Sequence, residues 1–181
     1  MAKLIYGMMQ SLDGYVDGAD GKLTLPPPGP GLHRYWNERM ASVAGVIYGR
    51  RMYEVMRFWD EPEAAEAEPD FARAFRACPK WVVSRTLDSV GPSAAMLGGD
   101  LKGEVERLKA SHDGELEVAG PEIAGSLTAL GLINEYHLYL MPHVLGGGKP
   151  YFAGGARPGG LELIGSEQLP EGVALVKYRR V

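Results

Sequence analysis

The chain has 181 residues, enough to bury a substantial core, and its net charge of −4 argues against broad nucleic-acid binding. Cys78 is the only cysteine and the four histidines are scattered, so neither an intrachain disulfide nor a metal cluster is expected. No secretory signal and no apolar stretch of roughly 20 residues for a membrane span is visible. We therefore expect one domain over residues 1–181, cytoplasmic and metal-free.

The first half of the chain predicts strands alternating with helices. A strand over Lys3–Gln10 ends in the turn of residues 11–14, because Asp-Gly is a strong turn signal. The four prolines of Leu25–Gly31 predict a loop, and the acidic, alanine-rich Pro62–Pro69 predicts a variable loop or frayed turn. Further strands are predicted over Gly45–Tyr48, Trp81–Ser84 and Ala94–Leu97, and helices over His33–Val43, Arg51–Phe58 and Phe71–Ala77.

The second half continues this alternation and then ends in strands alone. Asp100 is a good N-cap for the helix that follows it, and Pro121 suits the first position of another helix, which Gly131 ends. The pattern predicts an α/β fold with a mainly parallel sheet and an antiparallel C-terminal edge. The strands expected here are Glu115–Ala119, Tyr136–Pro142, Leu161–Ile164 and Val173–Tyr178.

Three segments place glycine, arginine or a helix start where a predicted strand ends. Ligands of open α/β sheets bind at the carboxyl ends of strands. Glycine lets a ligand approach the backbone, N–H groups at a helix start bind phosphate, and arginine adds bidentate donors. We therefore predict a pocket for an extended, phosphorylated ligand such as a dinucleotide. The segments are Gly49-Arg50-Arg51, Ser84-Arg85-Thr86 and Ala119-Gly120-Pro121-Glu122-Ile123.

Each segment also has a simpler interpretation. The hydroxyls and guanidinium of Ser84, Arg85 and Thr86 suit the 2′-phosphate of NADP, yet a polar turn fits them equally well. Helix starts with solvated arginines or ordinary capping chemistry explain the other two segments. The glycine-rich stretch Leu145–Pro150 lacks the spacing of a phosphate-binding P-loop, which favours a plain loop.

Asp13 is the only acid next to the end of the first strand. If burial raised its pKa, it could hold or protonate a substrate ring, which makes it our candidate catalytic residue. A turn aspartate that makes local backbone bonds is the simpler alternative.

Several motifs follow one another in an order typical of a known family. They are Lys3-Leu4-Ile5, Ser11–Tyr15, Tyr48–Glu54, Pro79–Leu87, Ala119–Pro121, Gly131–Glu135 and Pro142–Gly148. In these motifs the chain resembles the dihydrofolate reductase superfamily, and most closely the reductase domain of the bifunctional riboflavin-biosynthesis deaminase/reductase. No zinc deaminase signature is present, which excludes the two-step enzyme as a whole.

This resemblance implies a three-layer α/β/α fold and NADPH as the hydride donor. It places Gly49, Arg50 and Arg51 at the pyrophosphate and adenosine-phosphate side. It also places Ser84, Arg85 and Thr86 at the 2′-phosphate, and Ala119–Ile123 around the pyrophosphate and nicotinamide ribose. We expect an NADPH-dependent reductase of a small planar heterocycle, pteridine-like or pyrimidine-like. An NADP-binding module without turnover and a purely structural dimeric protein are the alternatives.

Two further expectations concern the backbone and the assembly. Folate reductases hold a cis peptide between two glycines at the turn that corresponds to residues 119–121. Here either Ala119–Gly120 or Gly120–Pro121 is expected to be cis, and proline makes the second less costly. A homodimer is expected, through an apolar patch that could instead be core. The patch comprises Tyr136, Leu138, Leu140, Tyr151 and Phe152.

Overall fold

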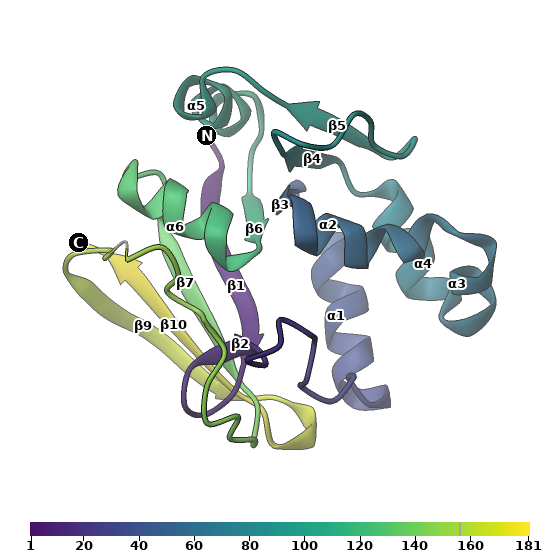
Figure 1. Cartoon of the computed structure of the whole chain (residues 1–181), viewed down its shortest axis with the longest axis vertical. Helices are drawn as coiled ribbons and strands as arrows, with labels where there is room; N and C mark the ends of the chain where they lie inside the picture. Colours follow the sequence, from purple (N-terminus) through teal and green to yellow (C-terminus); the bar gives the residue numbers. More distant parts are fainter. Residues whose placement is uncertain (156) are drawn as a thin grey trace.

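The computed structural model describes residues 1–155 and 157–181. Its main sheet contains β1 (Lys3–Gln10), β3 (Gly45–Gly49), β4 (Lys80–Val83), β5 (Ala94–Leu97), β6 (Glu115–Ala119), β7 (Glu135–Leu140), β9 (Leu161–Gln168) and β10 (Ala174–Arg180). The strand order is β5-β4-β3-β6-β1-β7-β10-β9 (Figure 1). The pairs from β5 to β7 are parallel, and β10 runs antiparallel to both β7 and β9. The predicted mostly parallel sheet with an antiparallel C-terminal edge is confirmed.

Helices cover both faces of the sheet and complete the three layers. They are α1 (Pro30–Ser42), α2 (Arg50–Met56), α3 (Pro62–Ala67), α4 (Pro69–Ala77), α5 (Leu101–Ser111) and α6 (Pro121–Ala129), with short 3₁₀ turns η1 (Arg57–Asp60) and η2 (Pro170–Gly172). Side chains of β3 alternate between the two faces, as in any strand. Ile47 packs with residues of α5 and α6, whereas Val46 and Tyr48 pack with residues of α1 and α4.

Two predicted loops are partly helical. Helix α1 begins at Pro30 rather than at His33, since proline fits the first helical turn. The Glu171 carboxylate accepts hydrogen bonds from the backbone N–H groups of Gly29 at 2.7 Å and Leu32 at 3.0 Å, which satisfies donors of that first turn. The predicted loop over Pro62–Pro69 is helix α3 instead, again with proline at its start and alanine in its interior.

A second, two-stranded sheet was not predicted. It pairs β2 (Tyr15–Asp17) with β8 (Lys149–Pro150) in antiparallel register. Both strands are too short for a periodic pattern to be visible in the sequence. Their pairing attaches the glycine-rich loop to the turn region that follows β1.

The prediction of a cis peptide at residues 119–121 is wrong. No peptide bond among the described residues is cis. Instead, Gly120 makes the turn from β6 into α6 with φ +121° and ψ +126°, a conformation that a residue without a Cβ adopts readily. Glycine at position 120 therefore makes this turn with all peptide bonds trans.

The apolar patch predicted for a dimer is largely core. Tyr136 and Tyr151 are buried and pack around Tyr6, with ring centroids 6.4 and 4.2 Å from that of Tyr6. Leu138 and Leu140 are half-buried, and only Phe152 is exposed. The alternation of β7 places Tyr136 against the helices rather than at the surface. The homodimer itself stays a prediction.

Candidate functional site

The three predicted ligand-binding segments converge at one edge of the sheet. Strand β3 lies between β4 and β6, and all three are parallel. Gly49 is in register with Val83 on one side, and Tyr48 with Ala119 on the other. The carboxyl ends of the three strands therefore meet, which brings together residues that are about 35 positions apart in the sequence.

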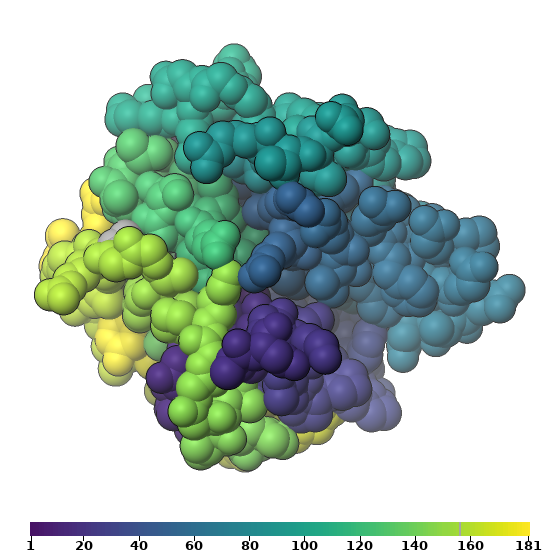
Figure 2. Space-filling model, viewed as in Figure 1, coloured from purple at the N-terminus to yellow at the C-terminus, as the bar shows by residue number. Residues whose placement is uncertain are grey.

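A cleft of about 210 Å³ lies over the ends of β3 and β6. The β2–α1 loop, α2, the start of α6 and the segment around residue 149 meet on this face (Figure 2). From the predicted segments, the lining includes Gly49, Arg50, Arg51, Gly120, Pro121, Glu122 and Ile123. Met8, Asp17, Gly21, Leu23, Met52, Val55 and Lys149 complete it. Ser84, Arg85, Thr86 and Ala119 do not line the cleft itself.

Two glycines expose the backbone at the base of the cleft. A Cβ on Gly120 would lie 3.6 Å from the Gly49 nitrogen, and one on Gly49 would lie 3.2 Å from Ile123 Cγ2. No side chain caps α6 at Gly120, so the first N–H groups of that helix are available to an anion. Close backbone approach and helix N–H donors are the features that a diphosphate requires.

Beside the cleft, the ends of β3 and β4 carry a cationic rim. Arg50 donates hydrogen bonds to Glu54 Oε1 at 2.9 Å and to Thr86 Oγ1 at 2.7 Å. The Ser84 hydroxyl oxygen accepts the backbone N–H groups of Thr86 and Leu87, at 3.1 and 3.0 Å. Arg85 is exposed and forms no ion pair with another described residue. The rim therefore offers guanidinium and hydroxyl groups to a phosphate that reaches beyond the cleft.

Asp13 lies outside the cleft and fixes the glycine-rich loop. Its carboxylate accepts hydrogen bonds from the backbone N–H groups of Leu145 at 3.1 Å and Gly146 at 2.7 Å. The Ser11 hydroxyl, followed by the Leu145 N–H, lowers the pKa of the Asp13 carboxyl. The raised pKa on which its predicted acid role depends is therefore not observed, and the contacts are those of a loop anchor.

Asp17 lines the cleft, although the sequence did not indicate it. Burial raises the pKa of its carboxyl, against the opposing charges of Lys149 and Arg51. The Asp17-Gly18 pair predicts a turn, so the sequence did not indicate the short strand β2, which places the Asp17 side chain in the cleft. The pairing of β2 with β8 is what places it there.

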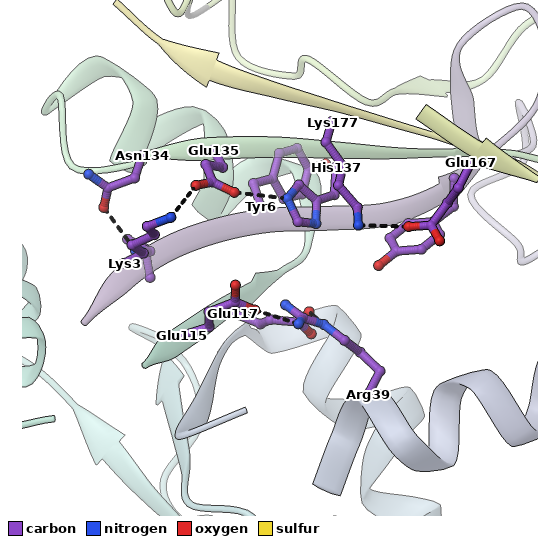
Figure 3. Close-up of polar contacts among 12 residues, drawn as sticks. Lys3, Tyr6, Arg39, Glu115, Glu117, Asn134, Glu135, His137, Glu167 and Lys177 are labelled. Carbon is purple, nitrogen blue, oxygen red and sulfur yellow. Dashed lines mark hydrogen bonds and ion pairs between the residues drawn. The ribbon is translucent and has the colours of Figure 1, made fainter. Parts of the chain in front are cut away.

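A separate polar network lies on the face of the sheet toward α1 (Figure 3). Arg39 of α1 donates to Glu117 Oε1 at 2.6 Å and to Glu115 Oε2 at 2.5 Å. Glu135 accepts from Lys3 at 2.9 Å and lies 3.2 Å from His137 Nε2. None of these residues lines the cleft, and each carboxylate has a basic partner. The network therefore consists of two balanced structural sets, one that joins α1 to β6 and one that joins β1 to β7.

Over residues 1–155 and 157–181, no three or more His, Cys, Asp or Glu side chains gather in a way that could hold a metal ion. In the same part of the chain, no helix is both long and apolar enough to span a membrane.

The architecture and the cleft define a three-layer α/β protein whose candidate ligand site lies at the carboxyl ends of parallel strands. The chain belongs to the RibD C-terminal domain family, whose model matches residues 2–175. This confirms the resemblance stated from the sequence motifs.

Individual proteins are similar over nearly the whole chain. The uncharacterized protein YyaP of Bacillus subtilis (strain 168) is 23% identical over 180 residues, which are 97% of this chain and 94% of YyaP. The crystal structure of a putative riboflavin biosynthesis protein from Shewanella sp. PV-4 has a TM-score of 0.74 at 25% identity, covering 100% and 99% of the two chains. Dihydrofolate reductase from Enterococcus faecalis, complexed with NADP(H), has a TM-score of 0.67 at 14% identity, covering 98% and 96%. The last similarity supports the fold alone.

Proposed function

We propose that this protein is an NADPH-dependent reductase that transfers a hydride to a small planar heterocycle, pteridine-like or pyrimidine-like. The observation that carries the proposal is the cleft over the ends of β3 and β6, where Gly49 and Gly120 expose the backbone, with the end of β4 beside it. Membership of the RibD C-terminal domain family supports it. The dihydrofolate reductase with the same fold is a complex with NADP(H), which further favours a nicotinamide dinucleotide.

The cleft and its rim suit different parts of the cofactor. The diphosphate fits the start of α6, where Glu122 and Ile123, the first residues of the helix with a backbone N–H, offer donors without a competing side-chain cap. The adenosine phosphate fits the rim of Arg50, Ser84, Arg85 and Thr86, where guanidinium groups supply charge-assisted hydrogen bonds. The bound cofactor supplies the hydride chemistry, and these side chains orient it.

The remaining lining suits a flat ring. Met8, Leu23, Met52 and Val55 supply apolar surface, and Asp17 is an acid in the same cleft besides Glu122. A carboxyl whose pKa is raised by burial can hold a ring N–H or deliver a proton after hydride transfer. We assign this role to Asp17 rather than to Asp13, whose carboxylate is occupied by backbone N–H groups.

The cofactor preference tests the proposal. Wild type should bind NADPH more tightly than NADH, and Arg85→Ala should lose roughly 10- to 100-fold in NADPH affinity, the range for one charged hydrogen bond. NADH affinity should stay unchanged, because NADH lacks the 2′-phosphate. Arg107→Ala, an exposed arginine on α5, is the matched control. Equal losses for NADPH and NADH would remove Arg85 from the 2′-phosphate, and no binding of either would refute the proposal.

A nucleotide-binding module without turnover is the second candidate. Its motive is that backbone N–H groups hold the carboxylate of Asp13, the acid predicted at the end of β1, so that turnover would depend on Asp17. Oxidation of NADPH by any member of a pteridine and pyrimidine panel would exclude it. Tight NADPH binding without oxidation across the whole panel would favour it over the reductase.

A further inference from the structure

The glycine-rich segment Leu145–Pro150 has no part in the proposed function so far, yet the fold holds one of its side chains in the cleft. Asp13 fixes its first residues through the N–H groups of Leu145 and Gly146. Gly148 has φ +139°, and a Cβ there would clash with the carbonyl oxygen of Asp17. Only glycine therefore allows β8 to pair with β2, and that pairing places Lys149 in the lining of the cleft.

Lys149 is a partly buried cation beside the start of α6. Its side chain is 20% exposed, and its ammonium group forms an ion pair with Glu122, whose side chain is 72% exposed. The hydrogen bond from Lys149 lowers the pKa of the Glu122 carboxyl. The other charged groups that face this position are Asp17 of β2 and Arg51 of α2.

We propose that Lys149 is an anion-binding residue of the cleft, which Glu122 holds until the dinucleotide diphosphate takes its place as the partner. This inference rests on the proposed function, since it names a further ligand for the diphosphate of that cofactor. Residue 122 belongs to the first turn of α6, the turn whose N–H groups we assign to the diphosphate. An ammonium that already reaches Glu122 is therefore within a short side-chain movement of that anion.

The energetics favour the exchange of Glu122 for the diphosphate as the partner of Lys149. Glu122 is largely exposed, and an ion pair with an exposed carboxylate contributes little to stability. The diphosphate as a whole carries more negative charge than one carboxylate, and it gains from the helix N-terminus as well as from the ammonium. The segment that carries Lys149 is tied down at both ends, by Asp13 and by β2, so little backbone order must be gained on binding.

The simpler alternative is that Lys149 and Glu122 only fasten the glycine-rich loop to α6. The two possibilities differ in which ligands respond to the lysine. A diphosphate contact affects NADPH and NADH by the same factor, because both cofactors carry the diphosphate. A fastening of the loop affects the stability of the protein and has no specific effect on a ligand.

Dissociation constants should be measured by titration calorimetry for NADPH, NADH and sodium pyrophosphate, with the melting temperature of each variant. We expect Lys149→Met to weaken all three ligands roughly tenfold and Lys149→Arg to stay within about threefold of wild type. Glu122→Gln should tighten binding, since it removes the competing carboxylate. Lys177→Met is the control, because Lys177 pairs with Glu167 on the face of the sheet away from the cleft.

The outcomes separate this inference from the proposed function. NADPH affinity within about twofold of wild type in Lys149→Met, with a lowered melting temperature, would overturn the inference and leave the proposed function standing. Binding of pyrophosphate that depends on Lys149, without binding of NADPH, would support Lys149 as an anion-binding residue and refute the dinucleotide as the ligand. If wild type bound none of the three ligands, both would be refuted.

Discussion

Replacing Arg39 by methionine tests how much the buried polar network of Figure 3 contributes to the fold. Arg39 joins the last turn of α1 to two carboxylates on one face of β6. Methionine has a similar length and keeps the packing of the aliphatic stem, so the main loss is the guanidinium. Two carboxylates then remain without their basic partner.

The magnitude follows from the unequal burial of those carboxylates. The Glu117 side chain is 14% exposed, whereas that of Glu115 is 37% exposed and can be rehydrated. Removing one partner of a fully buried ion pair costs about 3–5 kcal/mol. Because one of the two acids is half-exposed, we expect a loss of stability at the lower end of this range, about 3 kcal/mol at neutral pH. For a chain of this size, that corresponds to a melting temperature lower by about 6–12 °C.

The pH dependence identifies the cause. Burial already raises the pKa of the Glu117 carboxyl, and loss of Arg39 should raise it further. Between the unfolded and folded pKa values of Glu117, the folded variant then binds more protons than the unfolded chain. The loss of stability relative to wild type therefore shrinks as pH falls. Urea unfolding of both proteins at about pH 7.5 and pH 5 measures this. A loss of stability below about 1 kcal/mol, or one that is equal at both pH values, would contradict the reasoning.

Further predictions concern the cleft and His137. Gly49→Ala should weaken NADPH binding, because φ −75° suits alanine but its Cβ would lie 3.2 Å from Ile123 Cγ2 and crowd the cleft. Gly120→Ala should cost about 1–3 kcal/mol in urea unfolding, because φ +121° strains any residue with a Cβ. Burial lowers the pKa of His137, so the folded state resists protonation and wild type should lose stability as pH falls below about 6.5. His137→Gln should remove this part of the loss of stability at acid pH. Equal dependence of stability on pH in both proteins would count against a role for His137.

The elements of this protein are largely determined by local sequence. The bounds predicted for β1, β5 and β6 are those observed, because apolar runs closed by glycine, proline or acidic residues mark strand ends. Asp100 caps α5 by accepting the N–H of Lys102 at 3.2 Å, as its position in the sequence predicted. Helix starts that depend on distant partners were missed. Glu171 caps α1 from the far end of the chain, and no local pattern could reveal it.

The candidate site likewise has features that local sequence predicts and features that depend on long-range pairing. Glycine and arginine at three strand ends were visible in the sequence, since each segment is contiguous with its own strand. Their meeting at one edge of the sheet, two in the cleft and one beside it, depends on the strand order that places β3 between β4 and β6, which is a matter of long-range pairing. The positions of Asp17 and Lys149 depend on the pairing of β2 with β8, strands too short to have a periodic signal. Sequence patterns report local conformation and burial, whereas contacts between segments far apart are decided only when the whole chain packs.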